Sequence, residues 1–482
     1  MTRRDRTLAC LTTTSPSSCF LAALALALVG CGGAGVSSVG ASAPNAKPAA
    51  PQGVLHASPG SASVRDAPHE PVPVPAATKD VSLGGILAYA DQHSPVLSVA
   101  RSTRSRAEAA RVGASIVLPA NPELSVAAGP RMAPAGTGVD VEVGLTQQIQ
   151  IGGQRSSRKE AAARLGELTD AEIDQMRWAV HCDVHAAFHS SLVQQERVRL
   201  AERVVTFQVE VLRAVERQIA AGETAPLTLR LAQAEVAQAQ QVLVAAQQAF
   251  LVSRLRLARL SGWPVASPPK PAGVVDSPRD PPPLDHLSSV ARARLPGIRV
   301  GGARVREAKA REALAGSEGW PNPSIGAQYR REGAVADEGS TDIVMGVVSI
   351  PIPTFQRNQG ERAKARADVV VAEAELAATR QLLDGQLAEA RSEVVAAAAR
   401  TKAYGAEILP RFEENLVLLR RSFELGEIDI LALSAGRERF LRIQSDALAA
   451  HEDYFVALAG LERVVGVDLW LDDHEDHEET GR

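Results

Sequence analysis

Three histidines spaced four residues apart form the first group of side chains in this 482-residue sequence that could bind a metal ion. His181, His185 and His189 are accompanied by Cys182 and Asp183. If the segment is helical, successive histidines are rotated by only about 40°, so their rings share one face. Imidazoles at this spacing can bind a divalent transition metal. The same stripe could instead provide polar packing between helices, and both interpretations stay open.

A second histidine group lies in the acidic segment 471–482, where the sequence reads His474-Glu475-Asp476-His477. A charged terminal segment of this kind is more typical of a solvated end than of a ligand set. We therefore interpret residues 471–482 as an acidic, histidine-containing tail.

Motifs for catalysis are absent from the sequence. It contains no HExxH, no G-x-S-x-G and no Walker A loop, and its acidic residues are scattered. Aromatic residues make up only 4%, which is low for a compact enzyme of this length. The net charge of −4 disfavours a broadly basic nucleic-acid binder. We expect no enzymatic activity, no catalytic residue, no cofactor and no nucleic-acid partner.

The N-terminus has the features of a secretion signal. Residues 1–30 combine three early arginines with an apolar core at 20–29, which is too short to span a bilayer. The following Leu28-Val29-Gly30-Cys31 resembles the lipobox of bacterial lipoproteins, which implies cleavage before Cys31 and its acylation, with palmitate as one chain. A plain secretory signal with an incidental cysteine is the alternative. Residues 31–80 are rich in Pro, Ala and Ser and indicate a disordered tether.

The remainder of the chain consists of two copies of one unit. Asn121-Pro122 is repeated as Asn322-Pro323, Gly222-Glu223 as Gly426-Glu427, and Gly262 as Gly466, with an offset that changes only from 201 to 204. We place the first repeat at 81–263, a Pro-rich linker at 264–283 and the second repeat at 284–470.

Each repeat is expected to have the same order of elements. A helical segment comes first, two short strands follow, and a very long helix then leads through a glycine turn into a second long helix. Helices of about 65 residues measure on the order of 100 Å, which is too long for a compact domain and indicates a coiled coil or a tube. The expected helical ranges are 82–117, 154–220 and 227–262 in the first copy and 284–316, 358–424 and 430–466 in the second.

The strands show a period of two. Every second residue from Val139 to Leu145 is apolar, whereas the intervening positions include Asp140 and Glu142. Weaker alternation occurs at 123–128 and 324–330, and residues 341–352 have apolar side chains on both faces. The pattern suits a half-buried strand in water or a membrane strand with a lipid face and a lumen face.

Four such strands are too few to close a barrel on their own. Closed membrane barrels have eight strands or more, and lipid cannot satisfy open strand edges. No stretch beyond the signal segment offers about 20 consecutive apolar residues, so a membrane-spanning role would have to be carried by strands. If the strands span a membrane, several chains must contribute to one barrel.

The duplicated strand–strand–long-helix unit resembles the TolC-type outer-membrane factors, the outer membrane efflux protein family, over about residues 81–470. Within that family it is most similar to the cobalt-zinc-cadmium resistance (CzcC-like) branch. The resemblance is carried by four segments: Gln148–Arg155, Ser349–Gly360, Ile408-Leu409-Pro410 and Gly426-Glu427.

This resemblance implies a mainly α fold with a small β part, in which a homotrimer forms an outer-membrane β-barrel continuous with a periplasmic α-helical barrel. It implies as partners the outer-membrane lipid, a periplasmic membrane-fusion adaptor and an inner-membrane pump of the resistance-nodulation-division (RND) type. The chain would conduct cargo passively, with divalent heavy-metal cations expected first and drugs as the alternative. A periplasmic adaptor or structural coiled-coil lipoprotein is a further alternative, although an adaptor should have a lipoyl-like β domain and no duplication.

The two helix turns are the expected adaptor-docking tips. The residues concerned are Arg217, Gly222 and Glu223 in the first copy and Arg421, Gly426 and Glu427 in the second. The arginines could equally be cations favoured by the helix C-terminal dipole. Asp429 is a candidate for the periplasmic aperture, although a helix N-cap is the favoured interpretation.

One departure from the family concerns the segment after the second turn. Relatives usually read Asp-Val-Leu-x-Ala-Gln there, whereas this chain has Leu431–Gly436. An acidic gate therefore cannot be carried over to this segment.

Overall fold

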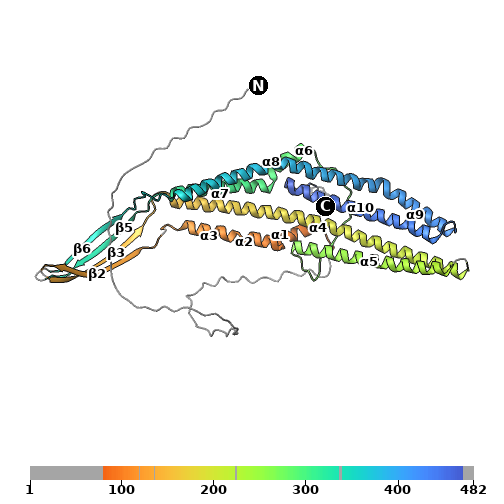
Figure 1. Ribbon diagram of the computed structural model, residues 1–482, viewed down its shortest axis with the longest axis horizontal. Coiled ribbons are helices and arrows are strands. Elements are labelled where there is room, and N and C mark those ends of the chain that lie inside the picture. Colours follow the sequence, from red (N-terminus) through yellow and green to blue (C-terminus); the bar gives the residue numbers. More distant parts are fainter. Residues whose placement is uncertain (1–79, 119, 135, 223–224, 336–338, 470–482) are drawn as a thin grey trace, which may run out of the picture. The chain divides into compact units, whose positions relative to one another are not determined.

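The computed structural model describes residues 80–469, with the exception of 119, 135, 223–224 and 336–338 (Figure 1). The predicted signal peptide, Cys31 with its tether, Glu223 and the tail 471–482 lie outside the described residues. No helix in the described ranges combines the length and the apolar character needed to cross a bilayer.

The first copy begins with three short helices and continues with two strands and two long helices. A two-residue strand, β1 (Asp80–Val81), precedes it and pairs in parallel with β4 (Lys270–Pro271). The elements of the first copy are α1 (Leu83–His93), α2 (Pro95–Ser102), α3 (Arg104–Ser115), β2 (Glu123–Ala133), β3 (Gly136–Gln148), α4 (Gln154–Ala220) and α5 (Pro226–Ser261).

The second copy repeats this order with fewer short helices. Its elements are α6 (Leu284–Arg294), α7 (Pro296–Ser317), β5 (Ser324–Glu332), β6 (Thr341–Ser349), α8 (Gln359–Ala403), a π-helix (Tyr404–Ile408), α9 (Leu409–Glu424) and α10 (Ile430–Val465).

Two of the helices predicted as continuous are broken at prolines. The segment expected at 82–117 divides before Pro95 and again at Thr103, and the segment expected at 284–316 divides before Pro296. Proline has no backbone N–H and disfavours helical geometry in the residue before it, so the chain bends before Pro95 and before Pro296 and starts a new helix there; the break at Thr103 has no proline.

The long helix predicted at 358–424 is also interrupted. A π-helix at Tyr404–Ile408 separates α8 from α9, directly before Pro410. Proline cannot donate the usual backbone hydrogen bond, and its ring clashes with the carbonyl four residues earlier, that of Ala406. A wider π turn relieves this conflict without ending the helix. The matching helix α4 runs unbroken for 67 residues.

Left-handed glycines end the second long helix of each copy. Gly262 caps α5 with φ 79° and Gly466 caps α10 with φ 87°. A Cβ at Gly262 would lie 2.1 Å from the carbonyl oxygen of His93, and one at Gly466 would lie 2.7 Å from the Cα of Leu295. Each glycine therefore permits both a left-handed turn and close packing against the proline break of the same copy.

The four longer strands form one antiparallel sheet in the order β2-β3-β5-β6. Leu124 pairs with Leu145, and Ile325 pairs with Val348, so these apolar side chains share one face. All four are exposed, by 65%, 54%, 48% and 68% respectively. The sheet thus presents an uncovered apolar face, with β2 and β6 as its two edges.

The opposite face of the sheet is mostly polar. Glu142 accepts from Arg330 at 2.7 Å, and Arg131 pairs with Glu332 at 2.9 Å. Strand β6 is the exception, because Val347 lies on this face while Val348 lies on the other. This arrangement follows from the mixed pattern noted at 341–352.

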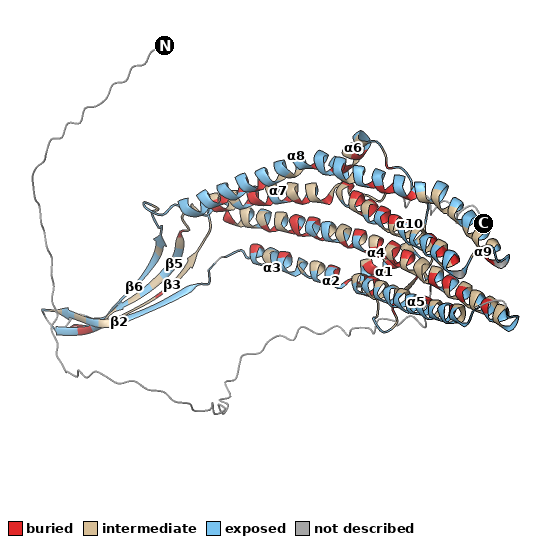
Figure 2. Cartoon of the chain, turned by 45° about the vertical axis from the view of Figure 1, so that its right-hand side comes forward, coloured by how far each residue is buried: buried red, intermediate tan, exposed pale blue. Residues whose placement is uncertain are grey.

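The apolar core occupies the contacts between helices, as the burial pattern in Figure 2 shows. Corresponding clusters occur in the two copies. In the first, Ile86, Val184 and Leu257 are fully buried, and in the second Leu287, Leu387 and Leu461 are fully buried. Helix α4 packs on α5 within its own copy and on α7 and α10 of the other, so it joins the two copies.

Candidate functional site

Helices α4 and α10 meet along a contact that we call the α4–α10 seam. It joins the two copies through polar contacts, of which His185–Glu462 and Arg437–Val204 are buried. Its pairs are His181–Asp468, His185–Glu462, Asp183–Arg463, Ser190–Glu452, Arg197–Glu452 and the contact of Arg437 with the carbonyl of Val204.

The seam contains two of the three predicted histidines. His181 Nε2 lies 2.6 Å from Asp468 Oδ1, and His185 Nδ1 lies 2.8 Å from Glu462 Oε2. Glu462 is fully buried, and its other carboxylate oxygen accepts the backbone N–H of Leu469 at 3.1 Å. A buried carboxylate needs such partners to offset its desolvation.

His189, the third predicted ligand, lies beside His185 with 4.9 Å between ring centroids, but it is not one of the three residues whose ligand atoms converge. Its ring stacks on Phe455 with 3.9 Å between centroids. Burial, together with the nearby His185, lowers the pKa of His189 to about 3. His189 is therefore neutral in the folded chain and packs as an aromatic side chain.

Cys182, next to His181 in the sequence, has a packing role. Its side chain is fully buried, and burial raises the pKa of its thiol to about 12. The neutral thiol therefore behaves as a small apolar group rather than as a nucleophile or ligand.

Asp468 was not part of the histidine group predicted from the sequence. One ligand atom each from His181, His185 and Asp468 lies within 4.8 Å of the others. Asp468 follows the left-handed Gly466 at the end of α10, and the turn there directs the chain back towards α4. The sequence Gly466-Val467-Asp468 places a carboxylate just after a helix end. That carboxylate reaches the histidines only because α10 packs on α4.

The two helix turns lie beside each other at the far end of the long helices (Figure 1). Val215, Ala232, Phe423 and Leu433 come from α4, α5, α9 and α10 and form one buried cluster there. The structure thus brings the two predicted docking tips together.

The predicted tip residues occupy helix ends. Gly222 and Gly426 have φ of 77° and 76°, and Arg217 and Arg421 are exposed in the last turns of α4 and α9. Their backbone carbonyls accept the N–H groups of Ala221 and Leu425, both at 3.0 Å. The exposed side chain of Glu427 follows Gly426.

Asp429 is the N-cap of α10. Its carboxylate accepts the backbone N–H of Ala432 at 2.8 Å. The cap uses one carboxylate oxygen, and the side chain remains exposed at the turn.

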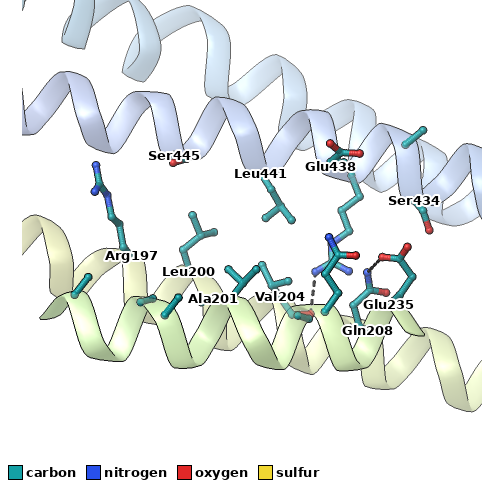
Figure 3. A pocket seen from close by; sticks show the side chains of 18 of the residues that line it. Arg197, Leu200, Ala201, Val204, Gln208, Glu235, Ser434, Glu438, Leu441 and Ser445 are labelled. Atoms are coloured by element: carbon teal, nitrogen blue, oxygen red, sulfur yellow. Dashed lines mark hydrogen bonds between the residues drawn. The ribbon is translucent and has the colours of Figure 1, made fainter. Parts of the chain in front are cut away.

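A groove with a volume of about 680 Å³ lies between α4, α5 and α10 near the tips. Figure 3 shows Leu200 and Val204 of α4 facing Ser434 and Leu441 of α10 across it. The sequence interpretation did not include this groove.

Arg437, which lines this groove, is almost completely buried. It donates to the carbonyl of Val204 at 2.9 Å, and its guanidinium lies 4.0 Å from the ring centroid of Phe207. Its Nη1 has no hydrogen-bond partner among the described residues. Burial lowers the pKa of Arg437 to about 10, although Glu235 opposes this change. Arg437 directly follows Leu431–Gly436, the segment in which the sequence departs from the family.

The sequence matches the family described as "Outer membrane efflux protein" over residues 90–263 and 287–467. The chain belongs to this family. The two matched segments correspond to the two copies seen in the structure, and the mainly helical fold with a small sheet is the one that the sequence predicted.

Known members and structures agree with this family assignment. The chain is 26% identical to the cobalt-zinc-cadmium resistance protein CzcC of Cupriavidus metallidurans over 330 residues, which are 66% of this chain and 75% of CzcC.

Two solved structures of outer-membrane proteins share the fold. The structure of CusC, described in terms of transmembrane channel formation, has a TM-score of 0.61 at 16% identity and covers 81% of this chain and 93% of CusC. The outer membrane protein VceC of Vibrio cholerae has a TM-score of 0.60 at 17% identity and covers 80% of this chain and 96% of VceC.

Proposed function

We propose that this chain is the outer-membrane duct of a tripartite efflux pump, which conducts its cargo passively from the periplasm to the exterior. The observation that carries the proposal is the uncovered apolar face of the open four-stranded sheet. In water such a face is unfavourable, whereas in a membrane it would contact lipid while the polar face lines a lumen.

A homotrimer satisfies the geometry of the sheet. The edges β2 and β6 present unpaired backbone groups, which lipid cannot satisfy. Three chains would join edge to edge into a twelve-stranded barrel, with the long helices continuing as a periplasmic tube. Helices α5 and α9 also expose apolar side chains that neighbouring copies could cover, including Val242, Val252, Val417 and Leu418.

The tips would dock the other components of the pump. The exposed Arg217, Arg421 and Glu427 beside the two turns offer charged contacts for a periplasmic membrane-fusion adaptor. An RND-type inner-membrane pump would supply the energy, so the duct itself would need no catalytic residue. Asp429, exposed beside the second turn, would lie at the periplasmic aperture.

We propose that Cys31 is acylated after removal of residues 1–30, and that residues 31–80 tether the body to the outer membrane. The proposed domain boundaries are 81–263 and 284–470 for the two repeats, with 264–283 as linker and 471–482 as tail. Mass spectrometry of the mature N-terminus tests the anchor, since a free Cys31 thiol would contradict it.

Divalent heavy-metal cations are the proposed cargo. The support is the similarity to CzcC, which is described as a cobalt-zinc-cadmium resistance protein. Export of organic toxins is the second candidate, because the fold of the chain does not identify its cargo.

The cargo is tested by deleting the gene and measuring growth with zinc, cobalt, cadmium, copper and a panel of organic toxins. We expect lower tolerance of the metals, restored by a plasmid copy. Unchanged metal tolerance with higher sensitivity to the organic toxins would contradict the metal cargo and leave the duct intact.

The lipid-facing sheet is tested by placing arginine on neighbouring positions of β2. Val126 lies on the apolar face and is 67% exposed, whereas Ala127 pairs with Glu142 on the polar face. Arginine at a lipid-facing position near the membrane centre costs about 2–4 kcal/mol. V126R should reduce the amount of assembled protein in the outer membrane, and A127R should not. Equal amounts of both variants would contradict the proposed orientation.

A further inference from the structure

We infer that His181, His185 and Asp468 form a binding site for one divalent transition-metal ion, such as Zn²⁺ or Co²⁺. The site would fasten the end of the second copy to α4 of the first. Two imidazole nitrogens and one carboxylate oxygen converge within 4.8 Å. None of these three residues lies in the four segments that carry the resemblance to the family.

The donor set suits zinc and its neighbours. Zinc binds histidine nitrogen at about 2.0–2.1 Å and carboxylate oxygen at about 2.0–2.2 Å, commonly in a tetrahedral arrangement. Ligand atoms around one such ion stand about 3.5 Å apart. His181 and Asp468 are partly exposed, with 23% and 25% of their side chains accessible, so both can rotate towards a shared ion. Water would complete the coordination at this accessible side.

The second ring nitrogen of His185 is already occupied by a carboxylate. Its Nδ1 contacts the buried Glu462 at 2.8 Å, which leaves Nε2 as the nitrogen available to a metal. Histidine ligands usually donate their other N–H to a carboxylate or carbonyl, which fixes the ring and increases its basicity. Glu462 is itself held by the N–H of Leu469. The site therefore has the outer support that metal-binding histidines require.

His181 is positioned by its neighbours as well. The indole of Trp178 stacks on its ring with centroids 5.0 Å apart, and Asp468 Oδ1 lies 2.6 Å from Nε2. In the metal-free chain the proton on Nε2 bridges these two atoms. A metal ion between the same atoms would require an unprotonated Nε2, so neutral His181 would bind as the tautomer that carries its proton on Nδ1.

The first copy has no counterpart to this arrangement. The offset of 204 that relates Gly262 to Gly466 places Ala258 where the second copy has Glu462. The site therefore arises from the packing of one copy against the other rather than from the repeated unit. It is separate from the question of cargo, because a duct for organic toxins could hold the same ion.

The test uses the full-length protein purified in detergent, freed of metal with a chelator and titrated with Co²⁺. Bound Co²⁺ in a low-coordinate nitrogen and oxygen site gives intense visible absorption, and Zn²⁺ should displace it. H181Q and D468N alter partly exposed side chains and should fold normally. H286Q changes an exposed histidine elsewhere, and H474Q/H477Q removes the histidines of the tail.

We expect wild type, H286Q and H474Q/H477Q to bind Co²⁺ with the same spectrum, and H181Q and D468N to lose most of that absorption. E462Q keeps the three ligands but weakens their support, so Co²⁺ affinity should fall by about 10–100-fold. The inference is overturned if H181Q and D468N bind like wild type, or if wild type gives only the spectrum of the hydrated ion. Because this readout is binding, its failure is distinguishable from a failure of the transport experiments.

Discussion

The middle of α4 and the tips of the hairpins are packed in different ways, although the same helices form both. In the mid-helix region, around His185 and the C-terminal end of α10, a fully buried carboxylate is satisfied by two partners. At the hairpin tips, a Cβ added at Gly222 or at Gly426 would have no atom of the described residues within 4 Å. A groove of about 680 Å³ and the buried Arg437, whose Nη1 lacks a partner among the described residues, also lie on the tip side.

This difference indicates separate roles for the two regions. Buried polar pairs require accurate geometry, so the mid-helix region fixes how the two copies align. The tip region has an open groove and free space around its two turn glycines, which permits rearrangement at lower cost. In the proposed duct, movement would thus be concentrated at the tips, where an adaptor would bind.

The largest expected effect is the loss of Glu462. In chelator-treated protein, E462A should lower the free energy of unfolding by about 3–5 kcal/mol, because His185 and the N–H of Leu469 lose a buried partner. E452A is the matched control, since Glu452 is partly exposed and pairs with Ser190 and Arg197. Chemical denaturation measures both, and equal losses would contradict a specially organised mid-helix region.

Alanine at the capping glycines compares the two regions directly. G466A should cost about 2–5 kcal/mol, because a left-handed alanine costs about 1–2 kcal/mol and the clash with Leu295 adds about 1–3 kcal/mol. G426A has nearly the same φ in open surroundings and should cost only about 1–2 kcal/mol. Thermal unfolding measured side by side gives the comparison. If G426A were as damaging as G466A, the tips would be packed as tightly as the middle.

Arg437 should contribute little to stability despite its burial. R437M keeps most of the side-chain volume and removes a charge that burial disfavours, so we expect stability within about 1 kcal/mol of wild type. The exposed Arg442 provides the control as R442M. A loss above about 3 kcal/mol in R437M alone, by chemical denaturation, would show that the tip is held by this arginine.

His451 on α10 should produce the smallest effect, visible only at acid pH. Burial lowers its pKa, and its Nδ1 has no hydrogen-bond partner among the described residues. The unfolded chain takes up a proton near pH 6.5, but the folded chain does so only at lower pH. Stability is therefore lost as the pH falls below about 6.5, by about 1.4 kcal/mol for each pH unit in which only the unfolded state is protonated.

H451Q removes this contribution, so its stability should fall less than that of wild type between pH 7 and pH 5. Denaturation curves at several pH values measure the difference. Parallel pH profiles for the two proteins would show that His451 is protonated equally well in the folded state.

The order of elements could be predicted from the sequence because hydrophobic period and the repeated glycines are local signals. Gly222, Gly426 and Gly466 mark helix ends regardless of what the helices pack against. The alternation at Val139–Leu145 likewise indicates a strand without knowledge of the neighbouring strands. The π-helix before Pro410 could not be predicted, since a proline in a long helix can be accommodated by a kink, a break or a wider turn.

The histidine group shows where sequence reasoning stops. The helical period places His181, His185 and His189 on one face, but it cannot say what faces them. Asp468 and Glu462 approach from α10 and its C-terminal turn, almost three hundred residues later in the sequence, and Phe455 stacks on His189, which is not part of the convergent ligand set. The buried Arg437 was missed for the same reason, because its environment is created by α4 of the other copy.

The native mass of the protein, extracted from outer membranes in mild detergent, shows whether three copies of this chain together form one outer-membrane duct. We expect a complex of three chains, with no other protein required for its assembly. A folded, stable single chain under those conditions would contradict it.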